Sequence, residues 1–378
     1  MFVGIANTPR DYAWGSRDDI AQLLGRKPSG GPEAEYWLGT HPGSPSRLET
    51  GGTLSDLTTL PFLLKVLAAD APLSLQAHPN LEQARAGFDR ESALGIPLDS
   101  PTRNYKDALH KPELVYALSD EYHALCGFRS VAATRELLAT LGPDPLVAGL
   151  LDRLVDDSSL RSVFEWLITR GDGVDELVAR VVELAASATG SSPAPLEFVT
   201  VGDLAAAYPG DPGIVIALLL NRVVLRRGQV LYLPAGNIHA YLKGLGIELM
   251  AASDNVLRGG LTPKYVDVPE LLGVLDFRPL PVPILEPIRP SAGIEIFRPD
   301  VPDFELVVVE PGGGSAVFTP TADSIALCTA GELTVSGASG SRSIPRGASV
   351  YVTADEGELT FAGTGTIFLA TSELTGPR

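Results

Sequence analysis

The stretch that most constrains this chain is residues 228–242, GQVLYLPAGNIHAYL. Its apolar alternation predicts a strand that ends at Pro234, because proline has no N–H to donate to a β-ladder and a fixed φ. Gly236 gives the backbone the freedom to turn sharply, and a second strand then begins near His239. The pattern predicts a strand, a tight turn, and a histidine held at a defined place on the next strand.

This spacing resembles the second motif of the cupin superfamily, whose small antiparallel barrels use that histidine as a metal ligand. Lys243 stands where many cupins have asparagine. The alternative is a Pro-Gly hairpin with a half-buried structural histidine, and the motif alone does not decide between the two.

Length and composition set the class of protein. The 378 residues, 45% hydrophobic and 20% charged, predict two or three globular domains. A net charge of −17 repels nucleic acid and anionic membranes, so we expect neither as a partner. Cys126 and Cys328 are too few for a disulfide framework or a thiolate zinc cluster. With no signal sequence and a longest apolar run of only residues 214–220, we expect a soluble cytoplasmic protein.

Two further segments carry potential metal ligands. In PLSLQAHP, residues 72–79, strand alternation places Gln76 and His78 on one face. A histidine before proline is usually structural, so this segment alone leaves both interpretations open. In NYKDALHKPEL, residues 104–114, Lys111 and Glu113 share a face if the segment is extended. Charged residues usually mark a solvated face, but Glu113 enters an apolar run, and a buried carboxylate needs a partner or a metal.

Helical patterns occupy the middle of the chain. Ser130 predicts the cap of a helix that runs to Leu141, Asp144 with Pro145 predicts a second start, and apolar residues recur at helical spacing over 174–182. Further helices are expected near 203–208 and 213–220, with a linker at 187–194. We interpret 129–221 as a helical insertion in a β domain, a packing module or lid without catalytic residues.

The remaining segments add charged and aromatic candidates. Glu248 lies in an apolar run, and a polar loop with Asp254 precedes Arg258, two glycines and Lys264. The aromatic turn at residues 11–15, with Trp14, is either a wall of a substrate site or core packing. From about residue 285 the chain is again strand-like but lacks the Pro-x-Gly-x-x-His pattern, which predicts a second barrel without a metal.

Taken together, PLSLQAHP, NYKDALHKPEL, PAGNIHAYL and SDNVLRGGLTPK resemble type I mannose-6-phosphate isomerase (phosphomannose isomerase), in order and spacing over nearly the whole chain. The resemblance implies a mainly β fold of two cupin (jelly-roll) barrels with an inserted helical domain. Its expected boundaries are 1–128 and 222–284 for the catalytic barrel, 129–221 for the insertion and 285–378 for the C-terminal barrel. Departures at Ala108, Leu109 and Gly259 affect only the rim of the expected site.

The resemblance also implies an activity and a site. The activity is the zinc-dependent interconversion of D-mannose 6-phosphate and D-fructose 6-phosphate through a cis-enediol, by a monomer with one Zn²⁺ per chain. The implied zinc ligands are Gln76, His78, Glu113 and His239. The implied catalytic residues are Arg258, Lys111, His110, Glu248 and Asp254. The implied substrate-binding residues are Lys264, Trp14, Ser74 and Tyr241.

This residue set is chemically consistent on its own terms. Two imidazoles, one carboxylate and one amide oxygen suit zinc and leave a position open for water or a sugar oxygen. Arg258 and Lys264 are natural receivers of a phosphate in an otherwise acidic protein. Two rival functions stay open at this point: a ferrous oxygenase, which also uses two histidines and a carboxylate, and a sugar-binding cupin without activity. The identity of the catalytic base also stays open.

Overall fold

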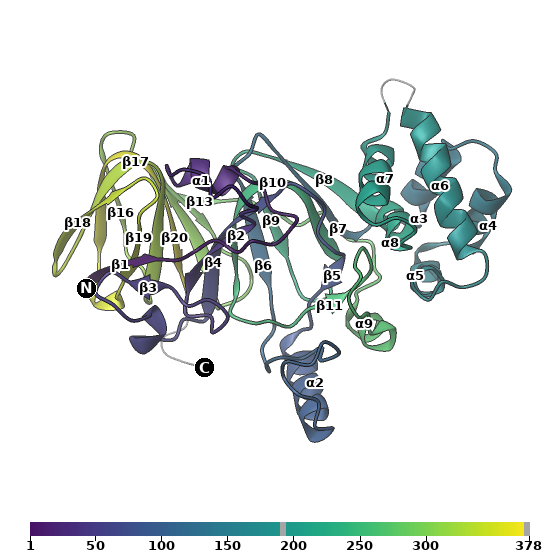
Figure 1. Ribbon diagram of the computed structural model, residues 1–378. Coiled ribbons are helices and arrows are strands. Elements are labelled where there is room, and N and C mark those ends of the chain that lie inside the picture. The colour runs from purple at the N-terminus through teal and green to yellow at the C-terminus, as the bar shows by residue number, and fades with distance from the viewer. Residues whose placement is uncertain (190–193, 374–378) are drawn as a thin grey trace.

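The computed structural model describes residues 1–189 and 194–373. Within these ranges the strands form two antiparallel sheets of ten strands each, and a group of helices stands at the far end of one of them (Figure 1). The chain is therefore mainly β with helical insertions, as predicted. None of the described helices combines the length and apolar character that crossing a membrane requires.

The sheet in the middle of Figure 1, here called the central sheet, is organised by one long strand, β10, which pairs with β4, β5, β6 and β7. Its strands are β2 (Glu35–Gly39), β4 (Phe62–Ala69), β5 (Gln76–Ala77), β6 (Glu113–Ala117), β7 (Glu121–Phe128), β8 (Leu220–Arg226), β9 (Val230–Leu233), β10 (His239–Ala251), β11 (Leu257–Arg258) and β12 (Ile284–Leu285).

The other sheet, here called the outer sheet, contains most of the C-terminal part of the chain. Its strands are β1 (Phe2–Ala6), β3 (Arg47–Leu48), β13 (Ile288–Ser291), β14 (Ile294–Phe297), β15 (Glu305–Val309), β16 (Ser315–Phe318), β17 (Ser324–Gly337), β18 (Gly340–Pro345), β19 (Ser349–Val352) and β20 (Leu359–Thr371).

Two N-terminal strands depart from the predicted division of the chain. β1 pairs with β19, and β3 pairs with β1, so both extend the outer sheet although they lie within residues 1–128. The assignment of 1–128 to the catalytic barrel stays a prediction, and the pairing places these two strands in the outer sheet. The physical reason is that alternation predicts a strand but not its partner, and this pairing joins residues about 350 positions apart, such as Phe2 with Val352.

The helices lie mostly between β7 and β8. In chain order the helices are α1 (Asp19–Leu23), α2 (Leu81–Ala93), α3 (Val131–Ala139), α4 (Pro145–Arg153), α5 (Leu160–Ile168), α6 (Val174–Thr189), α7 (Leu196–Ala207), α8 (Gly213–Ile216) and α9 (Val268–Val274).

The two predicted helix starts are confirmed. The Ser130 side chain accepts a hydrogen bond from Ala133 N, and the Asp144 side chain accepts from the amides of Leu146 and Val147. Such caps satisfy amide groups that the first helical turn leaves without partners. Half of the predicted linker at 187–194, residues 190–193, lies outside the described ranges, and residues 187–189 are the end of α6 and not linker.

The strand predicted over 72–79 is much shorter than expected. Only Gln76 and Ala77 are in strand conformation, as β5. Prolines at 72 and 79 bound the segment, and the amides of Leu73 and Leu75 donate outside the ladder, to Tyr241 O and Gly260 O. The segment therefore runs extended along β10 and β11 without forming a full strand.

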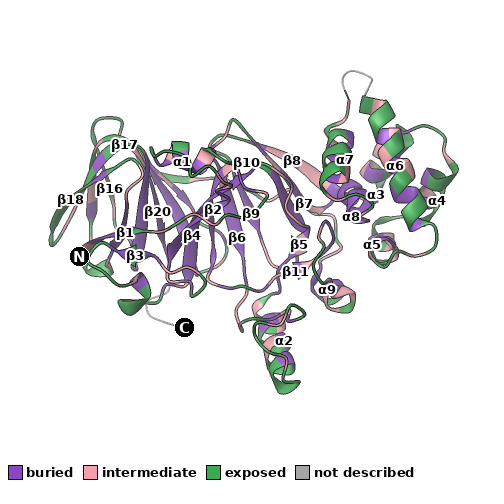
Figure 2. Cartoon of the chain, in the orientation of Figure 1, coloured by how far each residue is buried: buried purple, intermediate pink, exposed green. Residues whose placement is uncertain are grey.

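The two sheets share one apolar core. Leu64 and Val66 of β4 belong to the same buried cluster as Leu306 and Val308 of β15, and Tyr116 of the central sheet packs edge-on against rings of the outer sheet. Figure 2 shows the buried strands of both sheets side by side. A separate cluster joins the inserted helices to the ends of β5, β10 and β11.

Candidate metal and substrate site

A register shift in β10 decides which of its side chains point inward. The pairing with β7 runs His239 to Cys126 and Tyr241 to Ala124, and then slips by one residue before Lys243. Because strand side chains alternate, one extra residue moves the inward face from odd to even positions. His239 and Tyr241 before the slip and Glu248 after it are therefore all buried in the central sheet.

Three buried side chains converge at one end of this sheet. Within the described residues, His78, Glu113 and His239 form a group whose potential ligand atoms all lie within 4.8 Å of one another. Nε2 of His239 lies 2.9 Å from Oε1 of Glu113, and Nε2 of His78 lies 3.4 Å from Oε2. Each of the three residues is only 1% exposed. The segments that supply them are far apart in sequence, and β10 brings them together.

The second nitrogen of each imidazole is occupied by the backbone. Nδ1 of His78 lies 2.8 Å from Asn255 O, and Nδ1 of His239 lies 3.0 Å from Asn237 O. Since a carbonyl can only accept, each Nδ1 carries the proton and each Nε2 presents a lone pair toward Glu113. This is the tautomer that a metal ligand needs.

The facing atoms lack hydrogen bonds. In the described part of the chain, Nε2 of both histidines and Oε2 of Glu113 are buried and have no hydrogen-bond partner. Buried polar atoms without partners destabilise a fold unless something else satisfies them. Two imidazole nitrogens and a carboxylate oxygen match the ligands of a catalytic zinc ion, so these residues fit that metal.

The electrostatics of the group keep both ligand types in the form that binds a cation. Burial, followed by the nearby Lys111 charge, lowers the pKa of His78 to about 4. Burial opposes ionisation of Glu113, but Lys111 and His78 outweigh it and hold the pKa of this carboxyl well below its usual value. Lys111 Nζ lies 3.2 Å from Oε2 of Glu113. Near neutral pH the group therefore offers neutral imidazole and carboxylate.

A second buried group of charges lies on the same sheet, and sequence reasoning missed two of its members. Lys65 Nζ is 2.9 Å from Oε2 of Glu248 and 3.5 Å from Oε1 of Glu35. Burial opposes the charge on Lys65, but the two carboxylates outweigh it and raise the pKa of the ammonium group. The sequence does contain a signal for Lys65. It is a single lysine in the apolar run FLLKVLAA, just as Glu113 and Glu248 are charged residues in apolar runs.

A hollow of about 360 Å³ holds most of the predicted substrate residues. Trp14, Ser74, Gln76, Arg258 and Lys264 all line it. Gln76 pairs with both His239 and Arg258 in the sheet, so the hollow adjoins the His–Glu–His group. Trp14 stacks on Tyr12, with ring centroids 5.7 Å apart.

The two cations of this hollow have no carboxylate partner. In the described part of the chain, no carboxylate contributes to the pKa shift of Arg258 or of Lys264, and neither side chain forms an ion pair. Burial lowers the pKa of Arg258, and burial together with Arg258 lowers the pKa of Lys264. Two neighbouring cations without a counter-charge form a site for an anion.

Five of the predicted catalytic and substrate residues do not line this hollow: Lys111, Glu248, His110, Asp254 and Tyr241. His110 Nε2 is 3.0 Å from Asp303 Oδ2, in the segment between β14 and β15. Asp254 Oδ1 is 3.2 Å from His41 Nε2, a partner that sequence reasoning also missed. Tyr241 is buried, and its hydroxyl donates to Oε1 of Glu113 at 3.5 Å. The structure thus brings Lys111 to the metal-binding group, but not His110.

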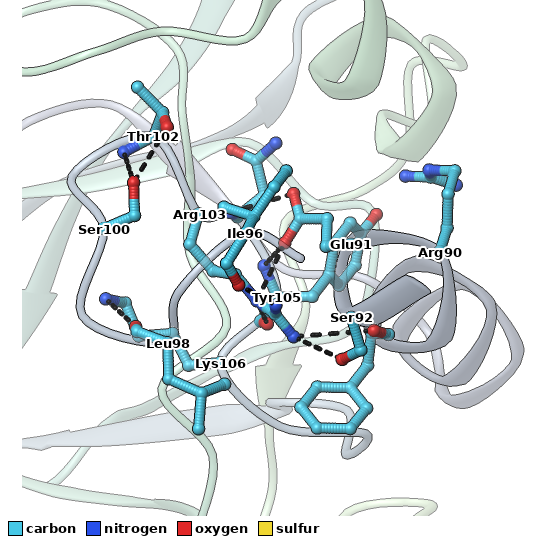
Figure 3. A network of polar contacts seen from close by, with 12 residues as sticks. Arg90, Glu91, Ser92, Ile96, Leu98, Ser100, Thr102, Arg103, Tyr105 and Lys106 are labelled. Carbon is cyan, nitrogen blue, oxygen red and sulfur yellow. Dashed lines mark hydrogen bonds and ion pairs between the residues drawn. The ribbon is translucent and has the colours of Figure 1, made fainter. Parts of the chain in front are cut away.

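A network behind the site fixes the loop that leads to Lys111. Figure 3 shows Arg103 beside Glu91 of α2, with Nε 3.2 Å from Oε2. The guanidinium also donates to Ile96 O and to Ser92 Oγ, while the Glu91 carboxylate accepts from the Tyr105 amide. Because this ion pair is buried and multiply bonded, it holds residues 94–107 against α2.

The same loop reaches the metal-binding group through Asn255. The Lys106 amide donates to Asn255 Oδ1 at 2.7 Å, and the Asn255 side-chain amide donates to Asp107 O and Leu109 O. Asn255 O in turn is the acceptor for His78 Nδ1. Contacts of this kind orient a ligand ring and are part of a metal site.

Comparison with known proteins now identifies the family. Residues 2–131 match the family described as "Phosphomannose isomerase type I, catalytic domain". The chain is 35% identical to the mannose-6-phosphate isomerase of Escherichia coli (strain K12), over 96% of this chain and 97% of the relative. It is 32% identical to that of Homo sapiens, over 92% of each chain. The chain belongs to the type I mannose-6-phosphate isomerase family.

Solved structures of this family superpose over nearly the whole chain. A zinc-bound mannose 6-phosphate isomerase matches with a TM-score of 0.88 at 33% identity, covering 99% of this chain and 100% of the other. The Salmonella typhimurium isomerase "bound to substrate (f6p) and metal atom (zn)" matches with the same TM-score, identity and coverage. The likeness includes the helical insertion as well as both sheets.

Proposed function

We propose that this chain is a zinc-dependent mannose-6-phosphate isomerase, which interconverts D-mannose 6-phosphate and D-fructose 6-phosphate through a cis-enediol. The observation that carries the proposal is the pairing of two features. The buried potential ligand atoms of His78, Glu113 and His239 adjoin a hollow in which Arg258 and Lys264 have no counter-charge among the described residues. A metal-binding group beside an anion site suits a phosphosugar.

The proposed zinc ligands are Gln76, His78, Glu113 and His239. The three facing atoms supply the two imidazoles and the carboxylate. Support for Gln76 comes from its position, since its backbone pairs with His239 and it lines the adjoining hollow. A bound zinc ion supplies positive charge that stabilises a negatively charged sugar oxygen.

The protein's own residues then divide the remaining work. Arg258 and Lys264 bind the phosphate or the oxyanion that develops, and the Arg258 guanidinium offers two parallel donors. Trp14 and Ser74 form the wall of the hollow. Tyr241 is proposed to contact the substrate from the side of Glu113, toward which its hydroxyl points.

Proton transfer is assigned to groups beside the metal-binding residues. Lys111, in ion-pair contact with Glu113, is proposed to move protons between substrate atoms. His110, Glu248 and Asp254 are proposed to assist. His110 is oriented by Asp303, Glu248 is paired with Lys65, and Asp254 is paired with His41. Each of these carboxylates and imidazoles is therefore held in one place by a partner.

The architecture belongs to the same proposal. We propose that the central and outer sheets each close as a cupin barrel, with the helices of 129–221 inserted in the first barrel and 285–378 forming most of the second. The pairing of β1 with β19 and of β3 with β1 supports including these two strands in the second barrel. The proposed protein is a monomer, and both of its cysteines are free and buried, which suits a reducing cytoplasm.

The test is a coupled assay for fructose 6-phosphate formed from mannose 6-phosphate. We expect turnover by the zinc-loaded chain, loss of turnover after a chelator, and recovery when zinc is added back. Oxygen uptake by the iron-loaded chain serves as the control for the oxygenase alternative. A zinc-loaded, folded chain that binds the sugar without converting it would refute the isomerase assignment.

A further inference from the structure

A carboxylate of the helical insertion accepts hydrogen bonds from the loop that carries Arg258 and Lys264. Asp211 lies between α7 and α8 and is half-buried. Its Oδ1 accepts hydrogen bonds from Gly213 N at 2.7 Å and from Leu261 N at 3.0 Å, and its Oδ2 accepts from Thr262 N at 3.4 Å. The carboxylate therefore joins the insertion to the turn midway between the two cations.

This turn is not one that its own residues prefer. Leu261 has φ of +53°, a conformation that residues with a Cβ seldom adopt. Such a residue persists only when its surroundings fix it. Here the Leu261 side chain is completely buried, and its amide is bound by Asp211. Without the carboxylate, the amides of Leu261 and Thr262 would lose their acceptor, and the turn would lose a restraint on its left-handed residue.

Two glycines allow the backbone of the insertion to lie close to the backbone of the turn. Gly260 has φ of +114°, and a Cβ built there would lie 3.2 Å from Oδ1 of Asp211. A Cβ built at Gly213 would lie 2.8 Å from the same oxygen and 2.8 Å from Leu261 Cγ. The backbones of the insertion and of the substrate loop are thus as close as glycine permits, with the carboxylate between them.

The turn is also tied to the segment of the proposed ligand Gln76. Gly259 N donates to Leu75 O at 2.7 Å, and Leu75 N donates to Gly260 O at 3.1 Å. Tyr208, which also lines the hollow, donates its hydroxyl to Pro72 O at 2.7 Å. The segment 208–213 therefore fixes both the start of the Gln76 segment and the turn after Arg258.

We propose that Asp211 is a positioning residue for Arg258 and Lys264, and that through it the helical insertion determines the geometry of the substrate site. Asp211 acts through the backbone of the turn and does not touch the substrate. The inference rests on the proposed function, since it assigns Asp211 a role in placing groups that bind the phosphosugar.

The test is a double-mutant cycle on the full-length, zinc-loaded chain. Asp211→Ala is expected to lower kcat/KM for mannose 6-phosphate by roughly tenfold to a hundredfold, the range for a small misplacement of binding groups, with zinc content unchanged. In a background that carries both Arg258→Ala and Lys264→Ala, the same change should cost only about threefold or less, because both groups that Asp211 positions are absent. Equal losses in the wild-type background and in this background would show that Asp211 acts independently of the two cations and would overturn the proposal.

Two variants separate positioning from general loss of structure. Asp211→Asn keeps an oxygen acceptor for the amides and should retain more activity than Asp211→Ala, so it carries the cycle if the alanine variant does not fold. Asp172→Asn removes a charge from an exposed aspartate elsewhere in the insertion, and kcat/KM should not change. An effect of Asp172→Asn as large as that of Asp211→Asn would contradict a specific role.

Amide hydrogen exchange gives a readout that does not depend on activity. Asp211→Ala should speed exchange in residues 257–264 and leave the strands of the outer sheet unchanged. Unchanged exchange in 257–264 would overturn the proposal even if the wild-type chain proved inactive. An inactive, zinc-loaded wild type would refute the isomerase function instead, so the two failures are distinguishable.

Discussion

Replacing Glu113 by glutamine tests the proposed metal site most directly, because it removes the only anionic member of the proposed ligand set at nearly constant shape. Glu113 is 1% exposed and lies within 3.4 Å of both imidazoles and of Lys111. The amide cannot neutralise either a divalent ion or the Lys111 ammonium group. Zinc affinity and the stability of the zinc-free chain should therefore both fall.

The two losses can be estimated separately. Removing one partner of a buried ion pair costs about 3–5 kcal/mol, so the zinc-free variant should lose about that much of its free energy of unfolding. Removing a residue that only orients a metal ligand weakens binding by about 10–100-fold. Losing a ligand itself should weaken zinc binding by at least the upper end of that range, about a hundredfold.

The assay is competition for zinc against a chromophoric chelator, combined with chemical unfolding of the zinc-free protein. Glu248→Gln is the matched control: Glu248 is also a buried carboxylate of the central sheet, but its partner is Lys65 instead of the imidazoles. Glu248→Gln should leave zinc affinity within a few-fold of wild type. Equal zinc affinity in Glu113→Gln and wild type would refute the ligand assignment.

Three further predictions follow from the same structure. Arg258→Ala should remove about 2–4 kcal/mol of transition-state stabilisation, which lowers kcat/KM roughly thirtyfold to a thousandfold, with zinc retained. Near-normal kcat/KM would remove Arg258 from the site. Because the pKa of His78 is lowered from 6.5 to about 4, the folded zinc-free chain binds fewer protons than the unfolded chain between these values. Its free energy of unfolding should stay constant above pH 6.5 and fall by about 3 kcal/mol as the pH drops to 4. The same pH dependence in a His78→Gln variant would contradict this prediction. A chain ending at residue 284 leaves β1 without β19 and exposes the core side chains of β4. At about 1.5–3 kcal/mol per exposed side chain, the loss rivals the whole stability of a domain, so this fragment should be insoluble or unfolded. Full heat stability of the fragment would show that the outer sheet is dispensable.

Local rules made much of the site predictable from the sequence. The caps at Ser130 and Asp144 follow from the side-chain chemistry of the first helical turn, and the structure confirms both. Glu113 was singled out because a carboxylate that enters an apolar run must find a partner, and it is buried between two imidazoles. His78 and His239 were found through their motifs, which record a spacing along the chain.

Long-range pairing decided the rest. Nothing in the alternation of residues 2–6 specifies β19 as their partner, and the slip in β10 that turns Glu248 inward depends on its pairing with β7. Lys65 acquires its role only when β4 lies beside β10, where its backbone pairs with that of Glu248.

The role of Asp211 could not be predicted from the sequence. In the sequence it is an ordinary aspartate before a proline, at the end of a helical region that carried no sign of function. Its partners, the amides of Leu261 and Thr262, are about fifty residues away and belong to another element. A sequence records which donors and acceptors exist, but only the packed structure brings a particular carboxylate within hydrogen-bonding distance of a particular turn, because that distance depends on every contact between them.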